Sequence, residues 1–172
     1  ALEAYKDCLT ALSFIHEAGI LHWDINPSNI YSFSVNESER KHNQFIDLDS
    51  AVEVSDILSG KHNIYSCATT GVWYTGREKT AYANLIENGE TDLVYVLDNT
   101  AIARVLLFML TGTTRSERIE TLCKKFSMAV STALSDFFAK SLYTTCDSDG
   151  HMDAEASLRG RDTSVSDMLV DI

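Results

Sequence analysis

Three oxygen-bearing side chains near the start of the chain have the types and spacing that phosphoryl transfer requires. Asp24 and Asn29 lie within the block Ile20 to Ile30, and Asp47 follows the apolar pair Phe45-Ile46 after a polar insertion. Phosphoryl transfer needs a group that orients the attacking hydroxyl and ligands for magnesium. Magnesium prefers hard oxygen ligands and takes only one or two of them from the protein. Asp24 suits the first task, and Asn29 with Asp47 suits the second.

The sequence around these residues resembles the catalytic region of protein kinases. Leu12 to His22 is similar to the helix and lead-in that precede their His-Arg-Asp catalytic loop. By this resemblance Asp24 is the catalytic-loop aspartate, Asn29 the asparagine that binds magnesium, and Asp47 the aspartate of Asp-Phe-Gly. The resemblance implies ATP and Mg²⁺ as cofactors. It also makes His22 a buried residue that braces the loop.

Landmarks further along the chain extend the resemblance over nearly its whole length. Gly71 to Glu78 resembles the end of an activation segment, with Glu78 in the place of the Ala-Pro-Glu glutamate. Asp98 to Gly112 resembles the central kinase helix, whose aspartate holds the catalytic-loop backbone by hydrogen bonds. Arg161 lies in a turn similar to the one before the last kinase helix, which implies an ion pair with Glu78. Such a pair would fix the substrate-facing loop, because losing one partner leaves the other charge buried.

The predicted elements are those of a mainly α domain with short strands around the catalytic loop. Apolar residues at helical spacing predict a helix from Leu2 to Ile15, ended by Gly19. Short runs typical of strands are Ile20-Leu21, Ile30 to Phe33 and Gln44 to Ile46. Val54 to Asn88 has little periodicity and is predicted to be largely irregular. We therefore expect one domain, residues 1–172, with the fold of a protein-kinase C-terminal lobe.

The second half of the chain is predicted to be helical around one buried element. Asp92 to Leu110 is apolar nearly all round, as in a helix at the centre of a domain, with Asp92 as its N-cap. Further helices are predicted at Ser116 to Lys125, Ser127 to Tyr143 and Ser164 to Leu169. The acidic stretch Thr145 to Arg161 lacks the ligand spacing of a calcium loop and is predicted to be a solvated loop.

Composition restricts the partners. The formal charge of -11 at pH 7 would repel nucleic acids and anionic lipids, so neither is an expected partner. The four cysteines lack paired spacing and are interpreted as reduced packing thiols. The apolar run Ala101 to Leu110 is shorter than the ~20 residues of a membrane span, and no signal peptide is apparent. We expect an intracellular, cytoplasmic protein with a protein substrate or partner.

Several positions depart from the kinase pattern. Trp23 replaces the arginine that binds a phosphorylated activation loop in many kinases, so control by loop phosphorylation is not expected. Asn26 replaces a lysine of serine/threonine kinases, which leaves tyrosine specificity open. Asp49 and Ala103 replace glycines. Tyr74, like the threonines shortly before it, is interpreted as an ordinary polar loop residue.

The leading hypothesis is a Ser/Thr protein kinase of which this chain is the C-terminal lobe. The chain begins at Ala1 inside an amphipathic pattern, so we expect it to lack its N-terminal lobe and to be inactive alone. The alternative is a pseudokinase-like scaffold whose exposed cleft face binds another protein. A third is an aminoglycoside or choline phosphotransferase, whose motifs are similar to His22-Trp23-Asp24 and Ile46-Asp47-Leu48. Ile46 to Ala51 also resembles fungal-type kinase groups.

Overall fold

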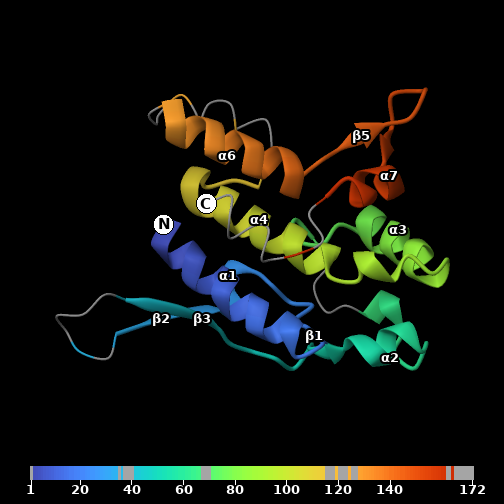
Figure 1. The fold of residues 1–172 in the computed structure, drawn as a ribbon, viewed down its shortest axis with the longest axis horizontal. Helices are drawn as coiled ribbons and strands as arrows, with labels where there is room; N and C mark the ends of the chain where they lie inside the picture. Colours follow the sequence, from blue (N-terminus) through green and yellow to red (C-terminus); the bar gives the residue numbers. More distant parts are fainter. Residues whose placement is uncertain are drawn as a thin grey trace.

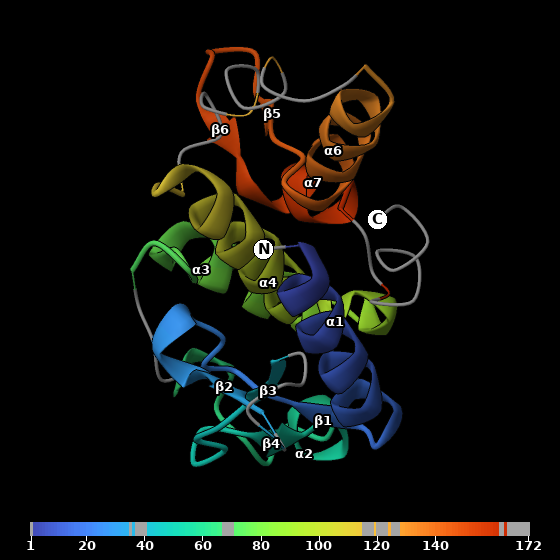
Figure 2. The same ribbon diagram turned by 90° about the vertical axis from the view of Figure 1, so that its left-hand side faces the viewer.

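A central helix organises the fold. The computed structural model describes residues 2–34, 36, 41–66, 71–114, 119, 124, 128–161 and 164. Helix α4 (Val96–Thr111) runs between α1 (Leu2–Glu17) on one side and α6 (Met128–Ser141) on the other, as Figures 1 and 2 both show. Within the described residues, strands occur only as three two-stranded antiparallel sheets. The predicted mainly α fold is confirmed.

Helix α4 is buried because apolar residues cover almost its whole circumference. Leu97, Ile102 and Leu106 are among its core residues, with little or no exposed surface. The helix ends at Gly112, whose φ of 73° suits a residue without a Cβ. The interpretation of Asp92 as the N-cap is wrong, because the chain first forms a 3-10 turn at Thr91–Leu93 and the α-helix starts after it.

The segment Thr91–Thr111 is long and apolar enough to cross a membrane by length and composition. However, 72% of its most apolar window is buried inside the domain. This burial is what a core helix requires, since its apolar side chains are already covered by the neighbouring helices.

The N-terminal part of the fold places the loop that carries Asp24 between short strands. Strand β1 (Ile20–Leu21) pairs with β4 (Val52–Glu53), and β2 (Ile30–Phe33) pairs with β3 (His42–Phe45). Helix α1 packs against β3. Strand β3 begins two residues before the strand predicted at Gln44 to Ile46 and ends one residue before it. The loop between β1 and β2 carries Asp24.

The region after β4 is more ordered than the sequence predicted. It holds α2 (Val54–Leu58), a 3-10 turn at Ile64–Ser66 and the longer helix α3 (Gly76–Glu87). The prediction of a largely irregular segment up to Asn88 is therefore wrong for α3. A capping box starts this helix, because the side chains of Thr75 and Glu78 each accept the other's backbone N–H.

Buried residues of α3 follow a helical stripe that the prediction overlooked. Ala81, Tyr82, Leu85 and Ile86 all lie in the core. Their spacing of three or four residues is that of one helix face. The alternation with charged and polar residues in so short a helix concealed the pattern.

The C-terminal part closes the fold against α3. Strands β5 (Thr145–Cys146) and β6 (Met152–Asp153) form a hairpin that leads into α7 (Ala154–Arg159), and α7 packs against α3. The segment predicted to be a solvated loop thus contains a hairpin and a short helix. The helices predicted at Ser116 to Lys125 and Ser164 to Leu169 fall almost entirely outside the described residues.

The described cysteines differ in their surroundings. Cys8 is buried in α1, and burial, with the nearby charge of Asp7, raises the pKa of its thiol to about 12. Cys146 is exposed on β5, so the interpretation as a packing residue is wrong for it. Cys67 and Cys123 lie outside the described residues.

Candidate functional site

Two amide side chains hold the carboxylate of Asp24. Its Oδ2 accepts a hydrogen bond from Nδ2 of Asn29 at 2.8 Å, and its Oδ1 accepts one from Nδ2 of Asn26 at 3.1 Å. The same two amides also donate to the backbone carbonyl of Asp24, at 2.9 and 3.1 Å. Such multiple hydrogen bonds restrict the carboxylate to one orientation.

The local sequence explains this geometry. Asn26 caps the 3-10 turn Pro27–Asn29, because its Oδ1 accepts the backbone N–H of Ser28 at 2.9 Å. Pro27 takes the first position of the turn, where its fixed φ is favourable. The turn brings Asn29 back over Asp24. Asn26, noted above only as the replacement of a lysine, therefore shapes the loop.

Asp98 anchors the loop that carries Asp24 to the central helix. Its Oδ2 accepts the backbone N–H of His22 at 2.7 Å, and its Oδ1 accepts that of Trp23 at 3.1 Å. The carboxylate is fully buried. Burial alone would raise the pKa of Asp98, but hydrogen bonds and charge from His16, followed by the N–H of His22, outweigh it and hold that pKa below its ordinary value.

Tyr74 is a member of the site that the sequence interpretation missed. Its hydroxyl donates to Oδ1 of Asp98 at 3.0 Å and accepts the backbone N–H of Ile25 at 2.9 Å. The side chain is fully buried, so the interpretation as an ordinary polar loop residue is wrong. No periodicity marks this residue in the sequence, because its partners come from two other segments.

His22 lies beneath the loop and packs against β3. Its Nδ1 accepts the backbone N–H of Asp24 at 3.3 Å, and its ring meets that of Phe45 edge to face, with centroids 4.9 Å apart. The side chain is fully buried, and in the described part of the chain its Nε2 has no hydrogen-bond partner. These contacts are those of a residue that supports the loop from inside.

The structure brings Glu78 and Arg161 together and adds a second arginine. Oε1 of Glu78 accepts hydrogen bonds from Arg161 at 2.6 Å and from Arg104 at 2.7 Å, and all three side chains are largely buried. Burial would raise the pKa of Glu78, but Arg104 and then Arg161 outweigh it, with help from Thr75, and lower it to about 2. The carboxylate is therefore ionised at neutral pH.

The two arginines tie separate segments to this carboxylate. Arg104 of α4 also donates to the carbonyl of Trp73 at 2.7 Å. Arg161 donates to the carbonyl of Tyr143 at 3.0 Å and to the hydroxyl of Thr100 at 3.1 Å. In the sequence, Arg104 lies within the apolar run Ala101 to Leu110. A charged residue within an apolar run that is buried indicates an ion pair, because a buried charge needs a partner.

Asp47 lies just beyond β3, beside the strand that follows Asn29. The backbone N–H of the preceding residue, Ile46, donates to the carbonyl of Asn29 at 2.9 Å. Asp47 is exposed and has a φ of 62°, which is uncommon for a residue other than glycine. The backbone thus places Asp47 close to Asn29 in the fold.

Oδ1 of Asn29 and the carboxylate of Asp47 are hard oxygen groups, the kind of ligand that magnesium prefers. Neither Oδ1 of Asn29 nor the carboxylate of Asp47 is hydrogen-bonded to any described residue. Two hard oxygen ligands are what magnesium usually takes from a protein. Among the residues the structure describes, no cluster of three or more His, Cys, Asp or Glu side chains could hold a metal by itself.

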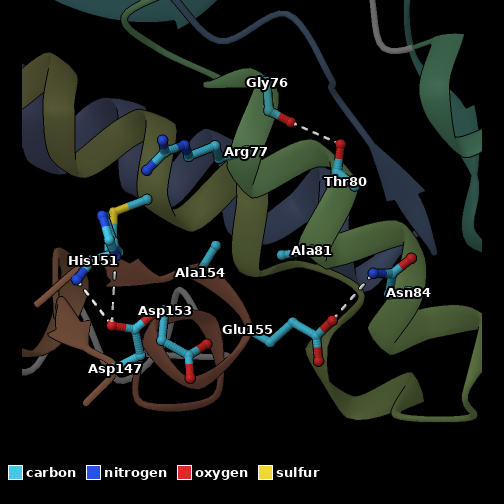
Figure 3. A pocket seen from close by; sticks show the side chains of 11 residues that line it. Gly76, Arg77, Thr80, Ala81, Asn84, Asp147, His151, Asp153, Ala154 and Glu155 are labelled. Carbon is cyan, nitrogen blue, oxygen red and sulfur yellow. Dashed lines mark hydrogen bonds and ion pairs between the residues drawn. The ribbon is translucent and has the colours of Figure 1, made fainter. Parts of the chain in front are cut away.

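A separate hollow of about 650 Å³ lies between α3 and the β6–α7 segment (Figure 3). Acidic side chains at its edge are Asp147, Asp153 and Glu155. Asp147 accepts two backbone N–H groups of its own turn, and Asp153 caps α7. Glu155 accepts a hydrogen bond from Asn84 of α3 at 3.1 Å. These carboxylates stabilise the hairpin, the helix and their packing, and we assign no ligand to them.

The mainly α fold and its anchored loop are consistent with a protein-kinase-like C-terminal lobe. In agreement, a family model described as fungal protein kinase matches residues 1–74. The match includes Asp24, Asn29 and Asp47, and it supports a protein kinase-like relationship. Glu78 and Arg161 lie beyond the matched residues. Searches of curated proteins and of solved structures gave no match.

Proposed function

We propose that the protein carrying this chain is a protein kinase that transfers the γ-phosphoryl group of ATP to a Ser or Thr hydroxyl of a protein substrate. The observation that carries the proposal is the carboxylate of Asp24, held by two amides on a loop anchored to Asp98. A carboxylate fixed in this way can orient a hydroxyl and accept its proton.

Other residues around Asp24 would bind Mg²⁺ or hold the substrate-facing segment in position. Asn29 and Asp47 would hold Mg²⁺, which neutralises charge on the phosphates when bound. The pair of Glu78 and Arg161 would keep the substrate-facing segment in place. We further propose that an N-terminal lobe supplies the remaining nucleotide contacts and that the protein acts in the cytoplasm.

Nucleotide binding tests the proposed ATP and magnesium site directly. The melting temperature of the chain is measured with Mg²⁺ alone and with Mg²⁺ and ATP, because a ligand of the native state stabilises it by about 2.7 kcal/mol at a hundredfold excess over Kd. We expect a rise that Asp47→Ala abolishes and that Asp136→Asn, an exposed change on α6, preserves. A rise of equal size in Asp47→Ala would contradict the assignment of Asp47.

A second candidate function is a scaffold that binds another protein at this face. Ile46 and Leu48, which flank Asp47, are 39% and 54% exposed. Exposed apolar side chains that gather in one place mark association sites. A full-length protein without ATP binding, whose association with a partner is lost in Leu48→Glu, would favour this function. The match to a protein kinase family favours a protein substrate over the small molecules of aminoglycoside-type enzymes.

A further inference from the structure

Trp23 has a backbone conformation that its surroundings must maintain. Its φ is 58°, in the left-handed region that a bulky residue rarely adopts. Its N–H donates to Asp98, and its side chain is only 1% exposed. Because Trp23 directly precedes Asp24, the backbone conformation of Trp23 determines the position of the Asp24 side chain.

One of the groups that packs on the indole comes from a distant segment. The ring of His62 meets the indole of Trp23 edge to face, with centroids 5.5 Å apart and planes at 64°. This is a favourable arrangement for two aromatic rings. The backbone N–H of His62 donates to the carbonyl of Asp56 in α2 at 3.0 Å, so the ring is presented from an anchored turn.

His62 also borders open space. It lines a hollow of about 490 Å³ with Ile64, Ile86 and Glu87, at the end of α3. Its imidazole therefore lies between this hollow and the indole. Removing the ring would extend the hollow towards Trp23, because a cavity in a packed region is filled only partly by relaxation.

We propose that His62 is a positioning residue, which holds Trp23 in its left-handed conformation through the ring contact and thereby fixes Asp24. The link to catalysis rests on the proposed function, whereas the contact between the two rings does not. His62 thus connects the segment after α2 to the loop that carries Asp24. This connection needs no phosphorylated residue.

The two tryptophans of the chain make this proposal measurable. In a Trp73→Phe background, Trp23 is the sole source of indole fluorescence, and acrylamide quenching reports its accessibility. We expect His62→Ala to raise the quenching constant by roughly twofold or more, since local opening exposes buried groups. His62→Phe, which keeps a ring, should restore the parent value. His42→Ala is the matched control, because it removes a histidine ring that contacts Phe33 in the β2–β3 hairpin. It should leave the quenching constant of Trp23 unchanged.

Each result of the quenching experiment either supports or overturns the role of His62. Unchanged quenching in His62→Ala, or a failure of His62→Phe to restore it, would overturn the proposal. If His62→Ala loses its cooperative melting transition, His62→Gln replaces it, since glutamine keeps much of the bulk without a ring. In an active full-length kinase, His62→Ala should lower kcat and His62→Phe should recover it. Absence of any activity in the parent would count against the proposed function and leave the fluorescence result intact.

Discussion

The hydroxyl of Tyr74 donates a hydrogen bond to Oδ1 of Asp98 at 3.0 Å. The same hydroxyl accepts the backbone N–H of Ile25 at 2.9 Å. All three residues are fully buried, so none of these groups can exchange its partner for water. One phenol therefore joins the segment before α3, the central helix and the loop that carries Asp24.

Tyr74→Phe should destabilise the chain by about 1–3 kcal/mol, because it leaves the N–H of Ile25 buried without an acceptor. Urea unfolding measures this loss. Tyr82→Phe is the matched control, since its hydroxyl donates to the carbonyl of Val94 at 2.8 Å in the core and away from the loop. Both changes should lower stability, but only Tyr74→Phe should weaken the thermal shift with ATP. A Tyr74→Phe chain as stable as the parent would contradict the role of this hydroxyl.

The stability of the chain should fall in acid because of Glu78. Its pKa is about 2 in the folded chain and 4.5 ordinarily, so the unfolded state binds more protons between these values. The stabilisation is complete above about pH 4.5 and is lost as the pH falls towards about 2, with a size on the order of 3 kcal/mol.

Urea unfolding at a series of pH values measures this loss, and Glu78→Gln should flatten the profile in that range. Glu90→Gln is the control. The hydrogen bond from Arg159 also lowers the pKa of Glu90, but that pair lies on the surface and its effect should fade at high salt. An acid slope that Glu78→Gln leaves unaltered would refute the assignment.

Asp24→Asn should lower kcat of the full-length protein by about 100-fold to 10,000-fold, because the loss of a general base has effects of this size. Asparagine has nearly the same shape, so the melting temperature should change little. A phosphorylation assay with Mg²⁺ and ATP gives the rate, and Asp136→Asn on α6 is the control for the loss of one carboxylate. An unchanged rate in Asp24→Asn would remove Asp24 from the mechanism.

Local features of the site and fold were predictable from the sequence. The helix near the N-terminus and the buried central helix follow from apolar periodicity, which acts over a few turns. Asp24 and Asn29 meet because they lie only five positions apart and a capped 3-10 turn folds the chain back between them. The pairing of Glu78 with Arg161 came from the family resemblance, since no rule of spacing joins residues 83 positions apart.

From the amino-acid sequence, the mainly α class and the buried central helix could be predicted, and Asp24 and Asn29 could be placed on one loop. The folded chain was needed to see that Tyr74 donates to Asp98 from 24 positions away and that Arg104 shares Glu78 with Arg161. The physical reason is that a buried polar group is satisfied by whichever partner the packing brings to it. Burial makes such a partner necessary, but the identity of the partner depends on how distant segments meet.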